Sequence, residues 1–259
     1  MSNTLTVALI QTDLVWENPE ANRKNLEQKV NAINGADIIV LPEMFSSGFT
    51  MNASAVAETM DDETITWLKA LSKSKNSAIA GSLVISENGN YYNRLVFIEP
   101  TGKITPYDKR HTFTLAGEHK VYTAGNERTI IDYKGWKICP LICYDLRFPV
   151  WARNTEDYDI LIYVANWPKL RIAAWDTLLK ARAIENMAYS IGVNRIGLDG
   201  NDYEYSGHSG AYDVLGNRID SMPENEETTE IVTLEKAHII KYREKLGFLK
   251  DRDTFSLKV

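Results

Sequence analysis

Two hydrophobic patterns alternate along the chain. Short, nearly continuous apolar runs are typical of strands buried on both faces of a sheet, whereas apolar residues three or four positions apart predict helices with one buried face. The expected strands of the first half are residues 5–11, 36–41, 77–86, 91–99 and 103–107. The first expected helix opens at Asn18-Pro19-Glu20 and is ended by Gly35, and the second covers residues 60–75.

Turn residues 87–90 connect two of these strands as a hairpin, so the middle of the chain is predicted to be a β-meander and not a βαβ repeat. In the second half, the expected strands are the segment from Gly135 to Cys143 and residues 158–165, 190–198 and 230–234, with a turn at 130–135 and a hairpin at 210–219. The expected helices are a short one after Pro149 and residues 173–189 and 235–246. Helices that alternate with buried strands and hairpins indicate an α/β or α+β class.

Composition and charge narrow the class of protein. The 259 residues are 44% hydrophobic and 25% charged, which fits one globular domain over residues 1–259. A net charge of -6 argues against a nucleic-acid partner, and no apolar run approaches the length of a membrane span. The N-terminus does not resemble a signal peptide, and two cysteines in a chain of this length predict a reducing compartment, hence the cytoplasm. Cysteine and histidine spacing predicts no metal site.

Cys143 is the first candidate for chemistry. A thiol at the tip of a buried strand, followed at once by polar residues, is where an α/β protein can present a nucleophile. The alternative is a small core residue, because free cysteine is among the most buried residue types. A disulfide with Cys139 is not expected, since four residues along a strand span about 13 Å.

Charged residues follow two other apolar segments. Glu43 comes after residues 36–41 and one proline, at a strand end where open α/β sheets place their chemistry, and Lys109 follows the extended segment 103–107. A single charged residue in such a position is usually part of a solvated loop. Beside a thiol, a carboxylate can accept the proton of the thiol and later that of water. A lysine can stabilise an oxyanion, aided by the backbone N–H of Tyr144. Sequence spacing does not fix whether these groups meet.

Three motifs around these residues resemble the signature motifs of the nitrilase (carbon–nitrogen hydrolase) superfamily. They are Leu41-Pro42-Glu43-Met44-Phe45, Tyr107-Asp108-Lys109-Arg110-His111 and Cys143-Tyr144-Asp145-Leu146-Arg147-Phe148-Pro149. One motif alone would be a weak signal, but all three occur in the order of the family. The likeness extends to Asn166-Trp167-Pro168 and to residues 182–186.

This resemblance implies a Glu-Lys-Cys catalytic triad. Glu43 would be the general base, Lys109 the oxyanion stabiliser and proton donor, and Cys143 the nucleophile. Glu118 is similar to a second glutamate that holds the lysine and orients the substrate. The family also implies a four-layer α-β-β-α sandwich, no metal or organic cofactor, and subunits paired into a homodimer or higher oligomer. The charged tail from about residue 247 either lies at that subunit interface or is loose.

Residues 43–49 and 149–154 resemble the omega-amidase branch, which hydrolyses the terminal amide of 2-oxoglutaramate or 2-oxosuccinamate. Such a small-molecule substrate carries a carboxylate, and Arg147 is the candidate to bind it, the alternative being a structural ion pair. Tyr144 and Asn166 are further candidates for substrate contact. Phe45 and Trp167 either wall the pocket or belong to the core.

Other interpretations keep parts of this account. Another aliphatic amidase or an N-carbamoyl amino acid hydrolase of the same superfamily would use the same chemistry on a different acyl group. A non-enzymatic metabolite-binding protein would not need Glu43, Lys109 and Cys143 at once. A redox sensor built on Cys143 would need a resolving partner, and Cys139 is too far along the strand.

Overall fold

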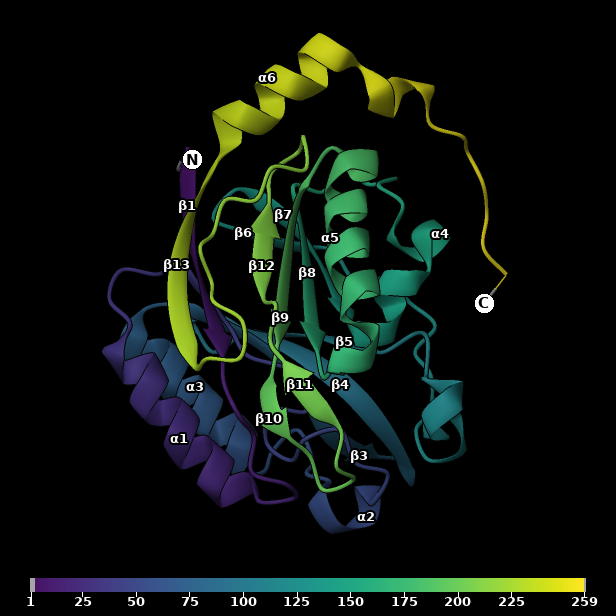
Figure 1. Ribbon diagram of the computed structural model, residues 1–259. Helices are drawn as coiled ribbons and strands as arrows, with labels where there is room; N and C mark the ends of the chain where they lie inside the picture. The colour runs from purple at the N-terminus through teal and green to yellow at the C-terminus, as the bar shows by residue number, and fades with distance from the viewer. Residues whose placement is uncertain (1–2, 259) are drawn as a thin grey trace.

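Two β-sheets packed face to face form the centre of the computed structural model, which describes residues 3–258 (Figure 1). The first sheet has the strand order β13-β1-β2-β3-β4-β5, and the second has the order β12-β9-β8-β7-β6. The strands of the first sheet are β1 (Thr4–Gln11), β2 (Ile38–Val40), β3 (Ala78–Glu87), β4 (Asn90–Ile98), β5 (Ile104–Asp108) and β13 (Thr228–Glu235). Those of the second are β6 (Ile131–Tyr133), β7 (Trp136–Ile142), β8 (Ile160–Ala165), β9 (Tyr189–Asn194) and β12 (Gly210–Tyr212). A separate ribbon pairs β10 (Ile196–Leu198) with β11 (Glu204–Ser206).

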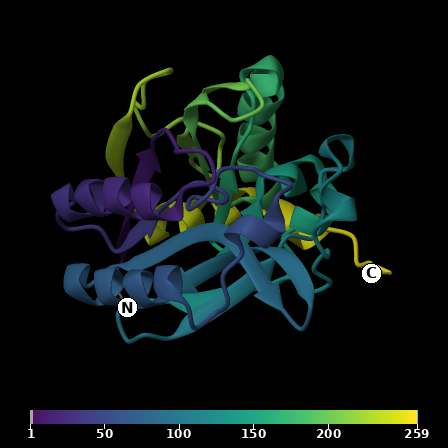
Figure 2. The same ribbon diagram turned by 90° about the horizontal axis from the view of Figure 1, so that it is seen from below.

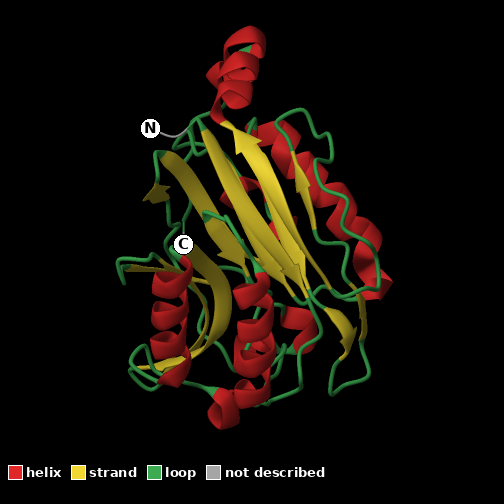
Figure 3. Cartoon of the chain, turned by 90° about the vertical axis from the view of Figure 1, so that its left-hand side faces the viewer, coloured by secondary structure: helices red, strands yellow, loops and turns green. Residues whose placement is uncertain are grey.

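Helices cover the outer faces of the sheets, which gives the layer order α-β-β-α (Figures 2 and 3). Helices α1 (Pro19–Ala32) and α3 (Glu63–Lys75) lie side by side on the first sheet, and α5 (Ile172–Asn186) lies on the second. The remaining α-helices of the described residues are α2 (Ala53–Val56), α4 (Pro149–Ala152) and α6 (Lys236–Leu246). The four-layer sandwich expected from the family resemblance is therefore confirmed.

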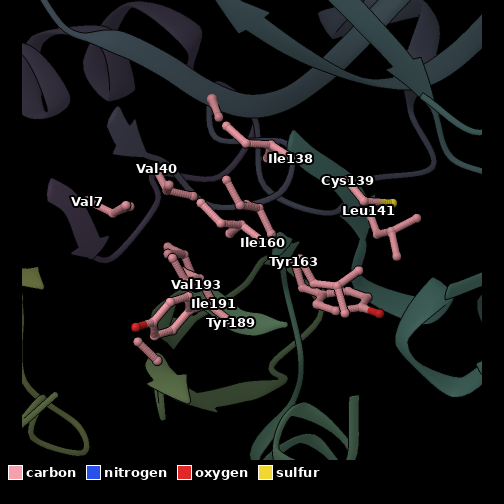
Figure 4. Packing of buried hydrophobic residues seen from close by; sticks show 14 of the residues in the cluster. Val7, Val40, Ile138, Cys139, Leu141, Ile160, Tyr163, Tyr189, Ile191 and Val193 are labelled. Carbon is pink, nitrogen blue, oxygen red and sulfur yellow. The ribbon is translucent and has the colours of Figure 1, made fainter. Parts of the chain in front are cut away.

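The alternation of side chains along each strand explains why two hydrophobic layers form. In β1, Val7 and Leu9 point toward the second sheet, whereas Ala8 and Ile10 pack under the helices of the first sheet. Figure 4 shows Val7 and Val40 of the first sheet facing Ile138, Ile160 and Ile191 of the second. Strands buried on both faces read as continuous apolar runs, which is the pattern that the sequence carries.

Parallel pairing places the ends of several strands at one edge of the sandwich. Strands β1, β2 and β3 run parallel in the first sheet, and β7, β8 and β9 run parallel in the second. Glu43, Cys143 and Asn166 lie in the segments that directly follow β2, β7 and β8. Chemistry in α/β sheets gathers at the carboxyl ends of such strands.

The structure corrects several expected boundaries. The segment 130–135, expected to be a turn, contains the strand β6, which pairs with β7. Only Lys134 and Gly135 form the turn between the two strands, and both have positive φ (50° and 83°). The helix expected over residues 173–189 ends at Asn186, because Met187 is left-handed (φ 46°) and the chain enters β9 directly. The strand expected over residues 190–198 is divided into β9 and β10. The short elements α2 and β11 are not foreseen by the hydrophobic pattern.

Helix α6 crosses one end of the sandwich (Figure 1). The segment that follows it contacts other residues of the same chain. Gly247 ends α6 at φ 70°, and Arg252 then donates to the backbone oxygen of Asn154 at 3.1 Å and pairs with Asp157 at 2.7 Å. Within residues 3–258, no helix is both long and apolar enough to cross a membrane.

Candidate active site

Four predicted side chains meet at one cavity of about 600 Å³. Lys109 and Cys143 line the cavity, while Glu43 and Glu118 are fully buried beside them. They come from four separate segments: the loop after β2, the end of β5, the short 3₁₀ helix Glu118–Lys120 and the turn after β7. The fold therefore brings together groups that sequence spacing could not place relative to one another.

Lys109 is the centre of a buried charge cluster. Its Nζ donates to Glu43 Oε1 at 2.8 Å and to both oxygens of Glu118 at 3.0 Å. The ring of Phe49 lies 5.1 Å from the same ammonium. Although burial opposes the charged form, the two carboxylates outweigh it and raise the pKa of Lys109 above its ordinary value. Lys109 is therefore held as an ammonium.

Two carboxylates around one ammonium leave an excess of negative charge in this cluster. Burial, which is stronger than the attraction of Lys109, raises the pKa of Glu118 above its ordinary value, and the charge of Glu43 adds to this rise. Asn93 of β4 lies between the two: its Nδ2 donates to Glu43 Oε1 at 2.8 Å and to Glu118 Oε1 at 3.3 Å. Sequence reasoning missed Asn93. Asn93 and Arg94 are polar residues that directly precede the buried apolar run 95–98 of β4, which is a weak signal in the sequence.

Cys143 is presented by a strained turn at the end of β7. Its φ of 43° lies in the left-handed region, which a non-glycine residue rarely adopts. The 3₁₀ turn Cys143–Arg147 begins there, and Cys143 is partly exposed to the cavity. Burial is the largest cause that raises the pKa of the thiol well above its ordinary value, and the charge of nearby Glu43 adds to it. The resting thiol is therefore protonated, beside a carboxylate that can accept its proton.

Asp145 joins the segment that carries Lys109 to the turn that carries Cys143. Its buried carboxylate accepts from Tyr107 Oη at 2.8 Å and from the backbone N–H of His111 at 2.9 Å. The His111 ring also contacts it at 2.8 Å. Asp145 stood in the third motif but was not singled out from the sequence. These contacts fix the Lys109 segment and the Cys143 turn against each other.

The substrate-facing residues expected from the sequence separate into two groups. Tyr144, Arg147, Asn166 and Trp167 all line the cavity. Phe45 does not: it is completely buried against Leu41, Gly81 and Trp67, so of its two expected places, pocket wall or core, the structure shows the core. Met44, at φ 43°, turns the chain so that the next side chain enters the layer between the first sheet and its helices.

Aromatic residues that the sequence did not single out complete the cavity. Phe49, four residues after Phe45, lines it, as do Trp16, Phe113, Tyr203 and Tyr205. The Arg147 guanidinium lies 4.8 Å from the ring of Trp167, and no acidic side chain of residues 3–258 pairs with that guanidinium. The cavity thus combines a half-buried thiol, an ammonium for an oxyanion, apolar walls and an unpaired cation.

Comparison with known proteins agrees with this geometry. The family model described as carbon-nitrogen hydrolase matches residues 6–244. The omega-amidase YafV of Escherichia coli K12 is 45% identical over 253 residues, which cover 98% of each chain. A 2-oxoglutaramate amidase of Bacillus subtilis is 34% identical, over 82% of this chain and 83% of that protein. The crystal structure of a CN-hydrolase superfamily protein from Xanthomonas campestris, with an arsenic adduct in its active site, has a TM-score of 0.97 at 38% identity and covers 99% of this chain and 100% of its own.

Proposed function

The chain belongs to the carbon–nitrogen hydrolase family, and from this membership we propose that it is an omega-amidase. It hydrolyses the terminal amide of 2-oxo dicarboxylic acid monoamides, such as 2-oxoglutaramate and 2-oxosuccinamate, to the acid and ammonia. The observation that carries the proposal is one cavity that joins the Glu43, Lys109 and Cys143 cluster to the unpaired Arg147. The omega-amidase and 2-oxoglutaramate amidase relatives support the choice of substrate.

The first half of the reaction forms a thioester. The Glu43 carboxylate accepts the Cys143 proton while the sulfur attacks the amide carbonyl carbon. The carbonyl oxygen becomes negative and is stabilised by the Lys109 ammonium and the backbone N–H of Tyr144. The carbon–nitrogen bond then breaks, and the nitrogen takes the proton from Glu43 and leaves as ammonia. The acyl group remains bound to the sulfur.

The second half releases the acid. Water attacks the thioester carbon and gives its proton to Glu43, while Lys109 and Tyr144 again hold the oxyanion. The carbon–sulfur bond breaks, and the sulfur regains a proton from Glu43. Glu118 keeps the Lys109 ammonium in place through both halves. Every group in this cycle comes from the chain, so it needs no metal or organic cofactor.

Asn93 donates to both carboxylates of the cluster, so its loss should slow the reaction. Asn93→Ala is expected to lower kcat about 10- to 100-fold, because two buried carboxylates lose their shared donor. Rates of ammonia release measure the effect. The matched control is Asn154→Ala, since Asn154 is equally buried but bonds Tyr158 and Asn186. That variant should lose stability and keep its kcat; an equal loss of kcat in both would contradict the role of Asn93.

Arg147 binds the carboxylate of the substrate in this account. Arg147→Gln is expected to raise KM for 2-oxoglutaramate about 10- to 100-fold, because a hydrogen bond between charged groups is lost. The kinetics of a neutral aliphatic amide should be unchanged. Arg171→Gln is the matched control: Arg171 also lines the cavity, but it lies over Phe113, 5.1 Å from that ring. If the neutral amide lost as much as 2-oxoglutaramate, Arg147 would not be the carboxylate site.

A substrate panel separates the proposal from the other members of the family. Ammonia release is measured from 2-oxoglutaramate, 2-oxosuccinamate, a simple aliphatic amide and an N-carbamoyl amino acid. The 2-oxo acid amides are expected to have the highest kcat/KM. A higher value for the carbamoyl compound or the aliphatic amide would keep the thioester chemistry and replace the substrate.

The same proposal extends to assembly and location. The active form is a homodimer or higher oligomer of single-domain subunits, with the segment after residue 247 at the subunit interface. The exposed apolar side chains of Val150, Phe248, Phe255 and Leu257 support this, because they lie on or near that segment. Both cysteines are free, which supports a cytoplasmic location. Sedimentation of the full chain beside a chain that ends at residue 246 tests the interface.

A further inference from the structure

Asn166 lines the cavity and has a buried side-chain acceptor that receives no hydrogen bond within residues 3–258. It follows β8, and Cys143 follows β7, so the two emerge from adjacent parallel strands in which Ile142 pairs with Val164. Asn166 is 4% exposed and lines the cavity. Its Oδ1 is completely buried, and no group of residues 3–258 donates a hydrogen bond to it. Buried polar atoms are nearly always hydrogen-bonded, so this atom points to a ligand.

The orientation of the Asn166 amide is fixed by Glu43. Asn166 Nδ2 donates to the Glu43 backbone oxygen at 2.5 Å, and the Asn166 backbone N–H donates to Glu43 Oε2 at 2.8 Å. The reverse orientation of the amide would bring two oxygen atoms together at the first of these positions. Oδ1 is therefore the polar atom of this side chain that remains free for a ligand, and the backbone N–H of the same residue positions the carboxylate of Glu43.

We propose that Asn166 Oδ1 accepts a hydrogen bond from the carboxamide N–H of the substrate and thereby selects amides over esters and acids. The inference rests on the proposed amidase function and deepens it. An amide nitrogen carries two N–H donors, whereas an ester oxygen carries only lone pairs. Oδ1 would hold one N–H, and the nitrogen would face Glu43, from which it takes the proton that lets it leave as ammonia.

The same contact favours release of the product. The product carboxylate has no N–H, so its oxygen would meet the lone pairs of Asn166 Oδ1. A site built around a buried acceptor discriminates strongly against a ligand that lacks the matching donor. Asn166 would thus bind the reactant and repel the product at the same atom.

The test compares an amide with its ester. For Asn166→Ala, kcat/KM for 2-oxoglutaramate is expected to fall about 10- to 100-fold, while kcat/KM for the corresponding terminal methyl ester stays within about threefold of wild type. Asn166→Ala keeps the backbone N–H that donates to Glu43 Oε2, so the carboxylate of Glu43 stays in place for both substrates. The amide-to-ester ratio therefore separates substrate contact from a structural role.

Asn194→Ala is the matched control. Asn194 is buried in the neighbouring strand end and bonds the backbone of Trp167 at 2.7 and 2.9 Å, so it supports the same loop without facing a reacting group. Its loss is expected to lower the amide and ester rates by the same factor. An unchanged amide-to-ester ratio in an active Asn166→Ala enzyme would overturn the inference.

A binding measurement covers the case in which the Asn166 variant turns over too slowly. In the Cys143→Ala background, calorimetry measures the Kd of 2-oxoglutaramate and of the product 2-oxoglutarate. Adding Asn166→Ala is expected to weaken the amide and to tighten the diacid; a parallel change in both would overturn the inference. If the wild-type chain releases ammonia from no amide, the proposed function itself fails, which is distinct from either outcome.

Discussion

Cys143→Ala is expected to lower ammonia release by about 10⁴-fold or more, because loss of one member of a covalent catalytic set removes nearly the whole rate enhancement. Among residues 3–258, no second thiol lines the cavity that could replace the sulfur. Cys139 is the second cysteine, but it is completely buried inside β7, and burial raises the pKa of its thiol to about 12. Alanine leaves Glu43 and Lys109 paired as before, so substrate binding should persist.

Cys139→Ala is the matched control for this prediction. It removes a thiol from the same strand and leaves a small core cavity, so it should cost stability and preserve kcat. Thermal unfolding shows whether each variant is folded. Substantial activity in a folded Cys143→Ala protein would refute the thioester mechanism at Cys143. Loss of activity in Cys139→Ala alone would indicate that Cys139 is the nucleophile.

Glu43→Gln is expected to separate catalysis from thiol reactivity. The amide is nearly isosteric with the carboxylate but cannot accept a proton, so kcat should fall about 10²- to 10⁴-fold, the contribution typical of a general base. Burial is the largest cause of the raised pKa of Cys143, and the charge of Glu43 adds to it. Removing that charge lowers the pKa, and at a fixed pH near 8 more of the thiol becomes thiolate.

Alkylation of Cys143 by iodoacetamide measures the second half of this prediction. The thiolate fraction rises about tenfold for each pKa unit removed, partly offset by the lower nucleophilicity of a less basic thiolate. The alkylation rate of Glu43→Gln should therefore be several-fold higher than that of wild type, and its rise with pH should begin at lower pH. Glu63→Gln, a change at an exposed carboxylate on α3, should alter neither quantity. A slower alkylation in Glu43→Gln would contradict the assigned cause of the raised pKa.

The candidate catalytic residues could be identified from the sequence, but their geometry could not. Glu43, Lys109 and Cys143 each follow an apolar segment that the hydrophobic pattern identifies, and the three motifs mark them. Their meeting depends on two sheets packing so that strand ends from both lie at one edge, which no local pattern encodes. Asn93 shows the same limit: its role follows from where β4 lies beside the loop after β2 and the turn at Glu118.

The pocket walls were the least predictable part because a single backbone conformation decides them. After β2, Met44 takes a left-handed conformation and directs Phe45 into the core, so that Phe49 becomes the aromatic neighbour of Lys109. Both phenylalanines stand in the same motif region, and only the turn separates their roles. Helix and strand ends were misplaced for a similar reason, since residues such as Met187 turn at positive φ without the glycine that would reveal it.

The central claim is that this cavity hydrolyses the terminal amide of a 2-oxo acid through Cys143. Ammonia release from 2-oxoglutaramate, measured beside glutamine, tests it most directly, because glutamine differs only by an ammonium group in place of the oxo group. The cavity also holds the Arg147 guanidinium, beside which a neutral oxo group is more favourable than an ammonium group. The account predicts release from 2-oxoglutaramate that exceeds release from glutamine by about 10²-fold or more and vanishes in Cys143→Ala. Equal release from glutamine, or release that persists in Cys143→Ala, would contradict it.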